Sequence, residues 1–296
     1  MKFISLTGGL GNQMFIYAFC LELRKRGYKT VLFAPRFKKS KGYGYQGYEL
    51  KKLFDINETI GFSAKLFNSL LTIYSQLIRI FPVRFKRLLF KLIGIYTVTV
   101  PENFIFYPDT FSFIYKNEIY MGTWQSEKYF LNAKDEIKKQ FVFKDELLSL
   151  ETKRILHQIK SCISVSIHIR RGDYLSPQYL NGFGGICTIN YYKKAIEIIK
   201  KQFLDSVFYI YTDDKNWVIE NFQIENGKFV LHNIGSDSWQ DMFLMSNCKH
   251  NIIANSSFSW WGAWLNSNPD KIVIAPKIWW KYFEKDDVVP ADWIRI

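Results

Sequence analysis

The second half of the chain alternates regularly between short apolar runs and segments of helical periodicity. The runs CISVSIHI, DSVFYIYT, KFVLHN, KHNIIAN and KIVIAPK are rich in β-branched and aromatic residues, as buried strands are. Between them lie INYYKKAIEIIKKQF, WVIENF, SWQDMFLMSNC and FSWWGAWLN, which are predicted to form helices. This alternation predicts a doubly wound parallel sheet in which KIVIAPK is the final strand.

The first half opens with a similar pattern. Residues 3–9 and 30–34 are predicted strands, and the segment from Gln13 to Arg26 is a predicted helix that Gly27 ends. A strand, a helix and a strand in this order indicate another parallel sheet. We therefore expect an α/β protein with an N-terminal domain over residues 1–150 and a C-terminal domain over residues 151–296. A ligand cleft is expected at the carboxyl ends of the strands.

The glycine turn after the first strand resembles the start of a dinucleotide-binding loop. Gly9 and Gly11 supply the first two glycines of that motif, but Met14 occupies the position of the third. The next strand ends without the acidic residue that would bind a ribose hydroxyl. These two departures argue against NAD binding. A turn that serves chain geometry alone and a polar or anionic ligand near Asn12 and Gln13 both remain open.

Composition narrows the class of partner without choosing one. The formal net charge is +13, from 40 basic and 27 acidic residues, which favours an anionic partner such as nucleic acid, a phosphorylated small molecule or an acidic membrane surface. The four cysteines form no CxxC pair and the four histidines show no metal-ligand spacing. We expect no metal site, no disulfide framework and a reducing, cytoplasmic location. No uncharged run has the composition of a membrane span.

Two further segments of the first half stand out by their composition. Residues 38–52 are rich in glycine and tyrosine and are predicted to form a surface loop. Residues 65–94 are amphipathic and basic, with a break at Pro82. Their apolar face can pack on the protein's own core or lie on an anionic membrane surface, and the sequence leaves both interpretations open.

The stretch SIHIRRGDY carries the strongest functional signal. His168 and Arg170 are expected on one side of the strand, while Arg171 begins the exit loop and Gly172 permits the turn. Two adjacent arginines at the carboxyl end of a strand suit a diphosphate. The alternative is a structural ion-pair network with Asp173.

Polar residues also follow two neighbouring strands. YTDD ends in Asp213 and Asp214, which can bind a ribose or base edge, or a metal, or cap the next helix. NSSFSWWGAW places Asn255, Ser256 and Ser257 at a helix start, which suits a phosphate. Phe258 can stack on a base or sugar, whereas the three tryptophans that follow are expected to bury the helix against the sheet.

Taken together, GGLGNQM, HIRRGDY, YTDD and NSSFSWWGAWL resemble the motifs of bacterial α-1,2-fucosyltransferases of glycosyltransferase family 11. The resemblance spans nearly the whole chain. It implies a GT-B-like fold with two facing Rossmann-like domains, in which residues 1–150, with the glycine-rich loop and a helical insertion, form the acceptor side and residues 151–296 bind GDP-fucose. It also implies inverting transfer of L-fucose from GDP-β-L-fucose to O2 of a terminal β-galactoside. It also implies that no metal or other cofactor is needed, because fixed arginines stabilise the departing GDP.

The resemblance also suggests roles for individual residues. Arg170 and Arg171 would hold the diphosphate, with Ser256, Ser257 and Phe258 on its other flank. His168 would lie beside the nucleoside, and the guanine edge would be read near His250. Asn12 would face the fucose or the acceptor. Arg170 and Asp173 are the catalytic candidates, Asp173 as a general base. The candidates for donor binding are Gly9, Gly11, Asn12, His168, Arg170, Arg171, Asp213, His250, Asn255, Ser256, Ser257 and Phe258.

Two rival functions remain from the sequence. A different metal-independent glycosyltransferase would use another nucleotide sugar. A basic nucleic-acid-binding protein would fit the net charge, but the chain has no helix-turn-helix, RNP or zinc-finger pattern. We therefore expect an enzyme of surface polysaccharide or oligosaccharide synthesis that binds no nucleic acid. If residues 65–94 lie on an anionic surface and not on the protein's own core, the enzyme would contact the inner membrane peripherally.

Overall fold

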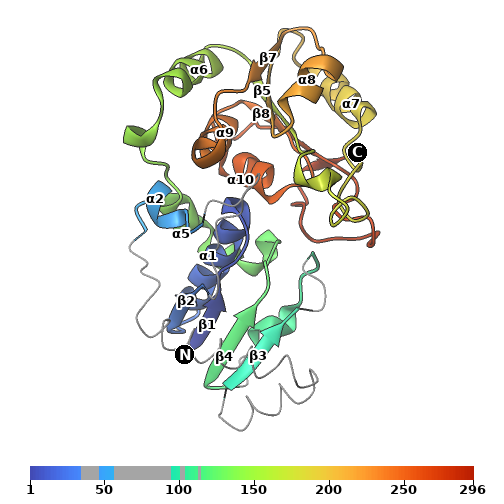
Figure 1. The fold of residues 1–296 in the computed structure, drawn as a ribbon. Helices are drawn as coiled ribbons and strands as arrows, with labels where there is room; N and C mark the ends of the chain where they lie inside the picture. The colour runs from blue at the N-terminus through green and yellow to red at the C-terminus, as the bar shows by residue number, and fades with distance from the viewer. Residues whose placement is uncertain (35–46, 57–94, 101–103, 113–114) are drawn as a thin grey trace. The chain divides into compact units, whose positions relative to one another are not determined.

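The computed structural model describes residues 1–34, 47–56, 95–100, 104–112 and 115–296 (Figure 1). The chain divides into two compact units, the first ending at Val142 and the second spanning Phe143–Ile296. The division falls before helix α6 (Leu150–Lys160), whereas the predicted boundary falls inside its first turn. The amphipathic segment 65–94 lies outside the described residues.

The first unit contains a parallel sheet of four strands in the order β2-β1-β4-β3 (Figure 1). The strands are β1 (Lys2–Ser5), β2 (Thr30–Phe33), β3 (Ile95–Thr99) and β4 (Asn117–Met121). The described helices of this unit are α1 (Leu10–Lys25), α2 (Leu50–Leu53) and α5 (Lys134–Gln140), together with short 3₁₀ turns. The predicted βαβ start is confirmed, but β3 and β4 escaped the sequence analysis.

Helix α1 ends as the sequence predicts. Gly27 has a φ of +86°, a left-handed conformation that glycine adopts without steric cost. Its amide donates to the Arg24 carbonyl at 2.8 Å, and the Tyr28 amide donates to the Leu23 carbonyl at 3.0 Å. These two bonds form a Schellman motif, which satisfies carbonyls that the end of the helix would otherwise leave open.

The core of the first unit is built largely from aromatic rings around α1. Phe19 stacks on Trp124 with ring centroids 4.4 Å apart and also contacts Tyr120 and Tyr129. Leu50 and Leu53 of α2 are fully buried, so the end of the predicted 38–52 loop is packed helix instead. Its apolar residues at a helical spacing outweigh the glycine and tyrosine signal that precedes them.

The second unit contains a parallel sheet of six strands in the order β10-β9-β8-β5-β6-β7. The strands are β5 (Ser164–Ile169), β6 (Val207–Thr212), β7 (Gly227–Val230), β8 (His250–Ile252), β9 (Val273–Ala275) and β10 (Ile294–Arg295). The doubly wound parallel sheet is thus confirmed. The expectation that KIVIAPK is the last strand was wrong, because β10 adds to the edge beyond it and is too short for sequence periodicity to reveal.

Helices cover both faces of the second sheet (Figure 1). They are α7 (Ile189–Lys200), α8 (Lys215–Asn221), α9 (Trp239–Ser246) and α10 (Ser257–Leu265). One face of β5, with Val165 and Ile167, joins a buried cluster with α7 and α8. On the other face Asn251 of β8 donates to Ser166 at 2.7 Å and to the carbonyl of Met245 in α9 at 2.8 Å.

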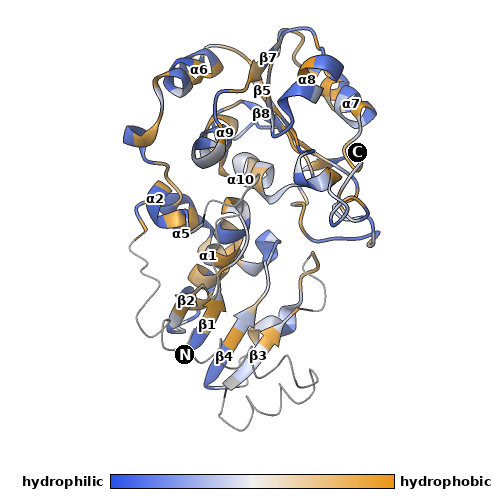
Figure 2. Ribbon diagram, viewed as in Figure 1, coloured by the Kyte–Doolittle hydropathy of each residue, from blue (hydrophilic) through white to orange (hydrophobic). Residues whose placement is uncertain are grey.

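The distribution of hydrophobic residues along each helix agrees with its position on the sheet. Figure 2 shows hydrophobic and hydrophilic residues mixed along α6 and α7, as expected of helices with one exposed face. Helix α10 is different, because Trp260, Trp261 and Trp264 are at most 4% exposed. The prediction that these tryptophans bury the helix is confirmed.

Candidate functional site

The topology of the second sheet identifies one place for a ligand. After β5 the chain adds β6 and β7 on one side, and it later adds β8, β9 and β10 on the other. The direction of winding therefore reverses between β5 and β8. The loops that follow these two strands diverge there, at the carboxyl ends where doubly wound sheets bind ligands.

Arg170 leaves β5 at this switch point. Its guanidinium pairs with Asp173 at 2.9 Å and with Asp213 at 3.0 Å, and its carbon lies 5.6 Å from the centre of the Tyr174 ring. The side chain is 17% exposed. Burial alone would lower the pKa of Arg170, but the two carboxylates outweigh it and raise this pKa. Arg170 is therefore a fixed, permanent positive charge.

Arg171 turns to a different set of partners. Its Nε donates to Asp214 at 3.0 Å, and its guanidinium carbon lies 3.7 Å from the centre of the Trp217 ring of α8. The ion pairs that the sequence left as the alternative to anion binding are thus present for both arginines. The two side chains are held by different carboxylates and rings, so they are not equivalent.

Asp213 organises the loop that carries both arginines. Its Oδ1 accepts hydrogen bonds from the amides of Arg171 and Gly172, at 2.9 and 3.1 Å. Its Oδ2 pairs with Arg170. A Cβ at Gly172 would lie 2.7 Å from this Oδ2, which explains why the position needs glycine. Asp214 caps α8 by accepting the amide of Trp217 at 3.3 Å, so the predicted capping role is confirmed for one of the two carboxylates.

The loop after β8 and the loop after β5, which carries Arg170, lie on the two sides of the switch point. A hydrogen bond joins these two loops. Tyr174 donates its hydroxyl to the Asn255 carbonyl at 2.9 Å. Ser256 caps α10 through the amide of Phe258 at 3.3 Å, while Ser257 and Phe258 are partly exposed in the first turn. The helix start that was predicted to suit a phosphate is therefore present, and its dipole favours negative charge there.

The side chain of Asn255 has a structural role, because it hydrogen-bonds to other parts of the chain. Its Nδ2 donates to the carbonyls of Phe183 and Trp279, at 3.2 and 3.3 Å, and its Oδ1 accepts from the Cys187 thiol at 3.5 Å. The residue is only 2% exposed. Its side chain joins the loops after β5 and β9.

Two predicted histidines lie in different parts of the sheet. His168 of β5 is 4% exposed, its ring is 5.7 Å from Phe258, and its buried Nδ1 has no hydrogen-bond partner in the described part of the chain. Burial lowers the pKa of His168 to about 3, so the ring is neutral. His250 instead pairs with Val165 near the amino end of β5, stacks on Phe203 at 4.5 Å and accepts the Ile272 amide at 3.0 Å. The structure does not bring His250 together with the other predicted site residues.

The glycine turn of the first unit forms a compact polar corner. Gly9 caps α1, Gly11 is buried inside the helix, and Gly8 has a φ of +79°. Asn12 accepts a hydrogen bond from Gln125, which follows β4, at 2.8 Å. Gln13 is fully buried and donates to the carbonyls of Gly8 and Gly47, at 3.0 and 2.7 Å. Asn12 is thus placed at the carboxyl ends of β1 and β4, whereas Gln13 holds the turn.

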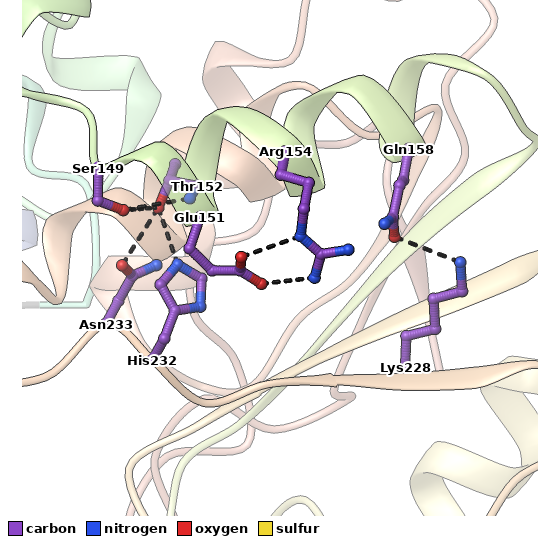
Figure 3. A network of polar contacts seen from close by, with 8 residues as sticks. All are labelled: Ser149, Glu151, Thr152, Arg154, Gln158, Lys228, His232 and Asn233. Carbon is purple, nitrogen blue, oxygen red and sulfur yellow. Dashed lines mark hydrogen bonds and ion pairs between the residues drawn. The ribbon is translucent and has the colours of Figure 1, made fainter.

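A buried carboxyl near the end of β7 was missed by the sequence analysis. His232 and Asn233 both contact the hydroxyl of Thr152 in α6, at 2.9 and 3.3 Å (Figure 3). Asn233 also donates to Asp241 of α9 at 2.8 Å. Burial raises the pKa of Asp241 to about 8, although Asn233 opposes the shift. The one available signal was an acidic residue within the apolar helix SWQDMFLMSNC.

The part of the chain that the structure describes contains neither a candidate metal site nor a helix that could span a membrane. Within the described ranges, no three His, Cys, Asp or Glu side chains gather in a way that could hold a metal ion. Among the described helices, none combines the length and apolarity that a membrane crossing requires.

Comparison with known proteins assigns the family. The family described as Glycosyl transferase family 11 matches residues 2–296. The chain belongs to glycosyl transferase family 11. It is a glycosyltransferase, as the sequence motifs predicted.

Relatives within and beyond bacteria support the assignment to family 11. An Escherichia coli α-1,2-colitosyltransferase is 34% identical over 98% of this chain and 97% of the relative. The O-antigen biosynthesis glycosyltransferase WbnK of E. coli is 31% identical over 98% and 99% of the two chains. A galactoside α-(1,2)-fucosyltransferase 1 of Ateles belzebuth is 23% identical over 69% of this chain and 64% of the relative.

A solved structure supports the fold of this family 11 member. The crystal structure of NodZ α-1,6-fucosyltransferase soaked with GDP-fucose has a TM-score of 0.50 and 16% identity, covering 91% of this chain and 96% of that one. The predicted GT-B-like class, with two Rossmann-like units and parallel sheets, is confirmed.

Proposed function

We propose that this chain transfers L-fucose from GDP-β-L-fucose to O2 of a terminal β-galactoside, with inversion at the anomeric carbon. Support comes from the family, from two relatives named as α-1,2-transferases, and from the two arginines at the switch point of the second sheet. The fixed guanidinium of Arg170 is the observation that carries the proposal.

Arg170 supplies charge where the reaction needs it. Breaking the bond between fucose and phosphate builds negative charge on GDP, and a preorganised donor stabilises it without rearranging. The start of α10 at Ser257 adds the positive end of a helix dipole at the adjoining strand end. These groups take the place of a metal, so transfer should persist in excess EDTA.

Asp173 has a role that depends on the donor. Its side chain is 34% exposed, more than that of Asp213, so it is the partner of Arg170 that a diphosphate displaces more easily. Displacement would release a carboxylate beside the reacting sugar. Asp173 is therefore our candidate for the base that accepts the proton of the acceptor hydroxyl. If Asp173→Asn retains most of its turnover, that role is lost and the residue is structural.

A second donor is favoured by one of the relatives. The 34% identical E. coli protein is named as a colitosyltransferase. Colitose is L-fucose without the hydroxyl at C3, so the two donors differ by one hydrogen-bonding group. A site that hydrogen-bonds this hydroxyl discriminates strongly against the deoxy sugar, because its polar groups are then left unpaired.

One set of measurements tests the proposed function. Isothermal titration with GDP, UDP and ADP should show binding of GDP alone. Incubation with GDP-fucose or GDP-colitose and lactose, followed by NMR of the product, then locates the new linkage and ranks the donors. Binding of UDP in place of GDP, or a linkage other than to O2 of galactose, would overturn the proposal.

The remaining expectations about partners need separate tests. A cytoplasmic location with peripheral contact through residues 65–94 predicts co-sedimentation with anionic liposomes at low salt. The nucleic-acid-binding alternative predicts salt-sensitive DNA binding that GDP does not affect. We expect no such DNA binding.

A further inference from the structure

A continuous set of aromatic rings extends from Arg170 along the surface of the second unit. Tyr174, whose ring lies beside Arg170, stacks on Phe183 with centroids 5.2 Å apart. Phe183 stacks on Trp280 at 6.1 Å, and Trp280 meets Tyr282 edge-on at 5.0 Å. Tyr179 contacts Phe183 at 6.2 Å. We call these five residues the aromatic platform. They come from the loops after β5 and β9.

Hydrogen bonds between the two loops hold the platform in place, in addition to the contacts between its rings. The amide of Lys281 donates to the Gly182 carbonyl at 3.0 Å, and Asn255 bonds both loops through Phe183 and Trp279. The indole of Trp280 lies against Gly182, where a Cβ would collide with its Nε1. The surface is therefore formed before any ligand arrives, which lowers the entropy cost of binding.

The outer part of the platform is open to solvent. Tyr282 is 61% exposed and Tyr179 is 37% exposed, and Leu175, Leu180 and Ile278, which are close to the rings in the sequence, are each at least 40% exposed. Exposed tyrosine and tryptophan rings are enriched at binding surfaces. Tyrosine adds a hydroxyl to a flat apolar ring, a combination suited to a ligand that has both apolar and hydroxyl faces.

We propose that the aromatic platform binds the sugar that precedes the terminal galactose of the acceptor glycan. The inference rests on the proposed function, because bond formation requires the acceptor hydroxyl within about 3–3.5 Å of the donor sugar. The platform begins beside Arg170 at Tyr174 and is open to solvent at its outer end, so it offers the rest of the glycan a surface to continue over. The ring hydrogens of a pyranose pack on an aromatic face, while its hydroxyls reach the tyrosine hydroxyls.

The test compares a short acceptor with a long one. In Tyr282→Ala, the KM for lacto-N-tetraose should rise about tenfold, whereas the KM for methyl β-galactoside should change less than twofold. Tyr282→Phe keeps the ring and should restore most of the affinity for the tetrasaccharide. Leu204→Ala removes an apolar side chain that is more exposed still (77%) and lies between α7 and β6, and it should change neither KM.

Two readouts separate this inference from the proposed function. GDP affinity and the slow hydrolysis of GDP-fucose without acceptor report on the donor site and should not change in Tyr282→Ala. The dissociation constant of lacto-N-tetraose for the GDP-loaded protein, measured by NMR, reports on the platform without turnover. Unchanged tetrasaccharide affinity in a Tyr179→Ala, Tyr282→Ala double variant would overturn the platform. Failure of the wild-type protein to bind GDP would overturn the proposed function instead.

Discussion

At the scale of single residues, Asp213 and Asp214 have different roles in holding the loop that carries Arg170 and Arg171. The sequence presents them as an equivalent pair, but Asp213 holds two loop amides and Arg170, whereas Asp214 caps α8 and holds Arg171. No pattern in YTDD distinguishes these roles, because they depend on which loop the neighbouring strand β5 presents. Asp213 is therefore a positioning residue for Arg170.

Replacing Asp213 should weaken both transfer and folding. Asp213→Ala leaves the partly buried amides of Arg171 and Gly172 without this acceptor, at a cost of about 1 kcal/mol each. Asp213→Asn keeps an acceptor for them but turns an amide donor toward the Arg170 guanidinium in place of the charged acceptor. We expect the urea midpoint to fall further in the alanine variant than in the asparagine variant, while kcat falls in both. Equal midpoints for the two variants would contradict the assigned hydrogen bonds.

Asp241 predicts a pH dependence of stability. Its folded pKa of about 8 lies well above the ordinary aspartate value of 3.8, so the unfolded chain releases the proton at lower pH than the folded protein does. The contribution of Asp241 to stability is complete below about pH 4 and is lost as the pH rises to about 8. Asp241→Asn keeps the bond from Asn233 and removes the ionisation. Its thermal midpoint should therefore rise above that of the wild type by several degrees more at pH 8 than at pH 5. A difference that does not vary with pH would contradict the raised pKa.

At the scale of elements, the sequence predicted best those features that depend on local chemistry. The strand–helix alternation, the end of α1 at Gly27 and the cap of α8 all arise from neighbouring residues. Strand β4 was missed because its pairing with the distant β1 defines it more than its own periodicity, and β3 pairs in turn with β4. Strand β10, which pairs with β9, is too short for periodicity to reveal. His250 was assigned to the guanine by resemblance alone, although the predicted strand KHNIIAN already puts it at the amino end, away from the loops that follow the strands.

Two glycines with positive φ should respond differently to alanine. A Cβ added at Gly27 would meet no other atom within 4 Å, so Gly27→Ala costs only the left-handed backbone, about 1–2 kcal/mol, and leaves activity unchanged. Gly8 has a similar φ, but a Cβ there would lie 2.5 Å from Nδ2 of Asn12. Gly8→Ala should therefore also displace Asn12 and lower kcat. Urea unfolding and turnover measured on both variants test this difference. Equal kcat values would contradict a role for Asn12 in the reaction.

At the scale of the whole molecule, the chain combines two parallel α/β units with different chemistry at their strand ends. The second unit contains the switch point, Arg170, the start of α10 and the aromatic platform. The first contains the glycine turn and Asn12. The sequence suggested both units, because each begins with its own strand–helix pattern. It did not suggest the platform, because aromatic residues spread over two distant loops have no spacing that marks them as a group.

This division of chemistry predicts that donor binding belongs to the second unit. Residues 143–296 expressed alone should unfold cooperatively and bind GDP with an affinity within about tenfold of that of the full chain. Residues 143–296 carrying Arg170→Ala serve as the matched control and should bind GDP more weakly. A folded second unit with no affinity for GDP would contradict the assignment of the donor to this sheet.

The most direct test of the role of Arg170 is the transfer rate of Arg170→Ala under single turnover, with saturating GDP-fucose and lactose. Arg170→Lys keeps the charge but loses the planar fork, and it provides the intermediate case. We expect a fall of about 10²–10³ in the rate for alanine, with an unchanged circular dichroism spectrum, and a smaller fall for lysine. A rate near that of the wild type in the folded alanine variant would contradict the claim that this guanidinium stabilises the departing GDP.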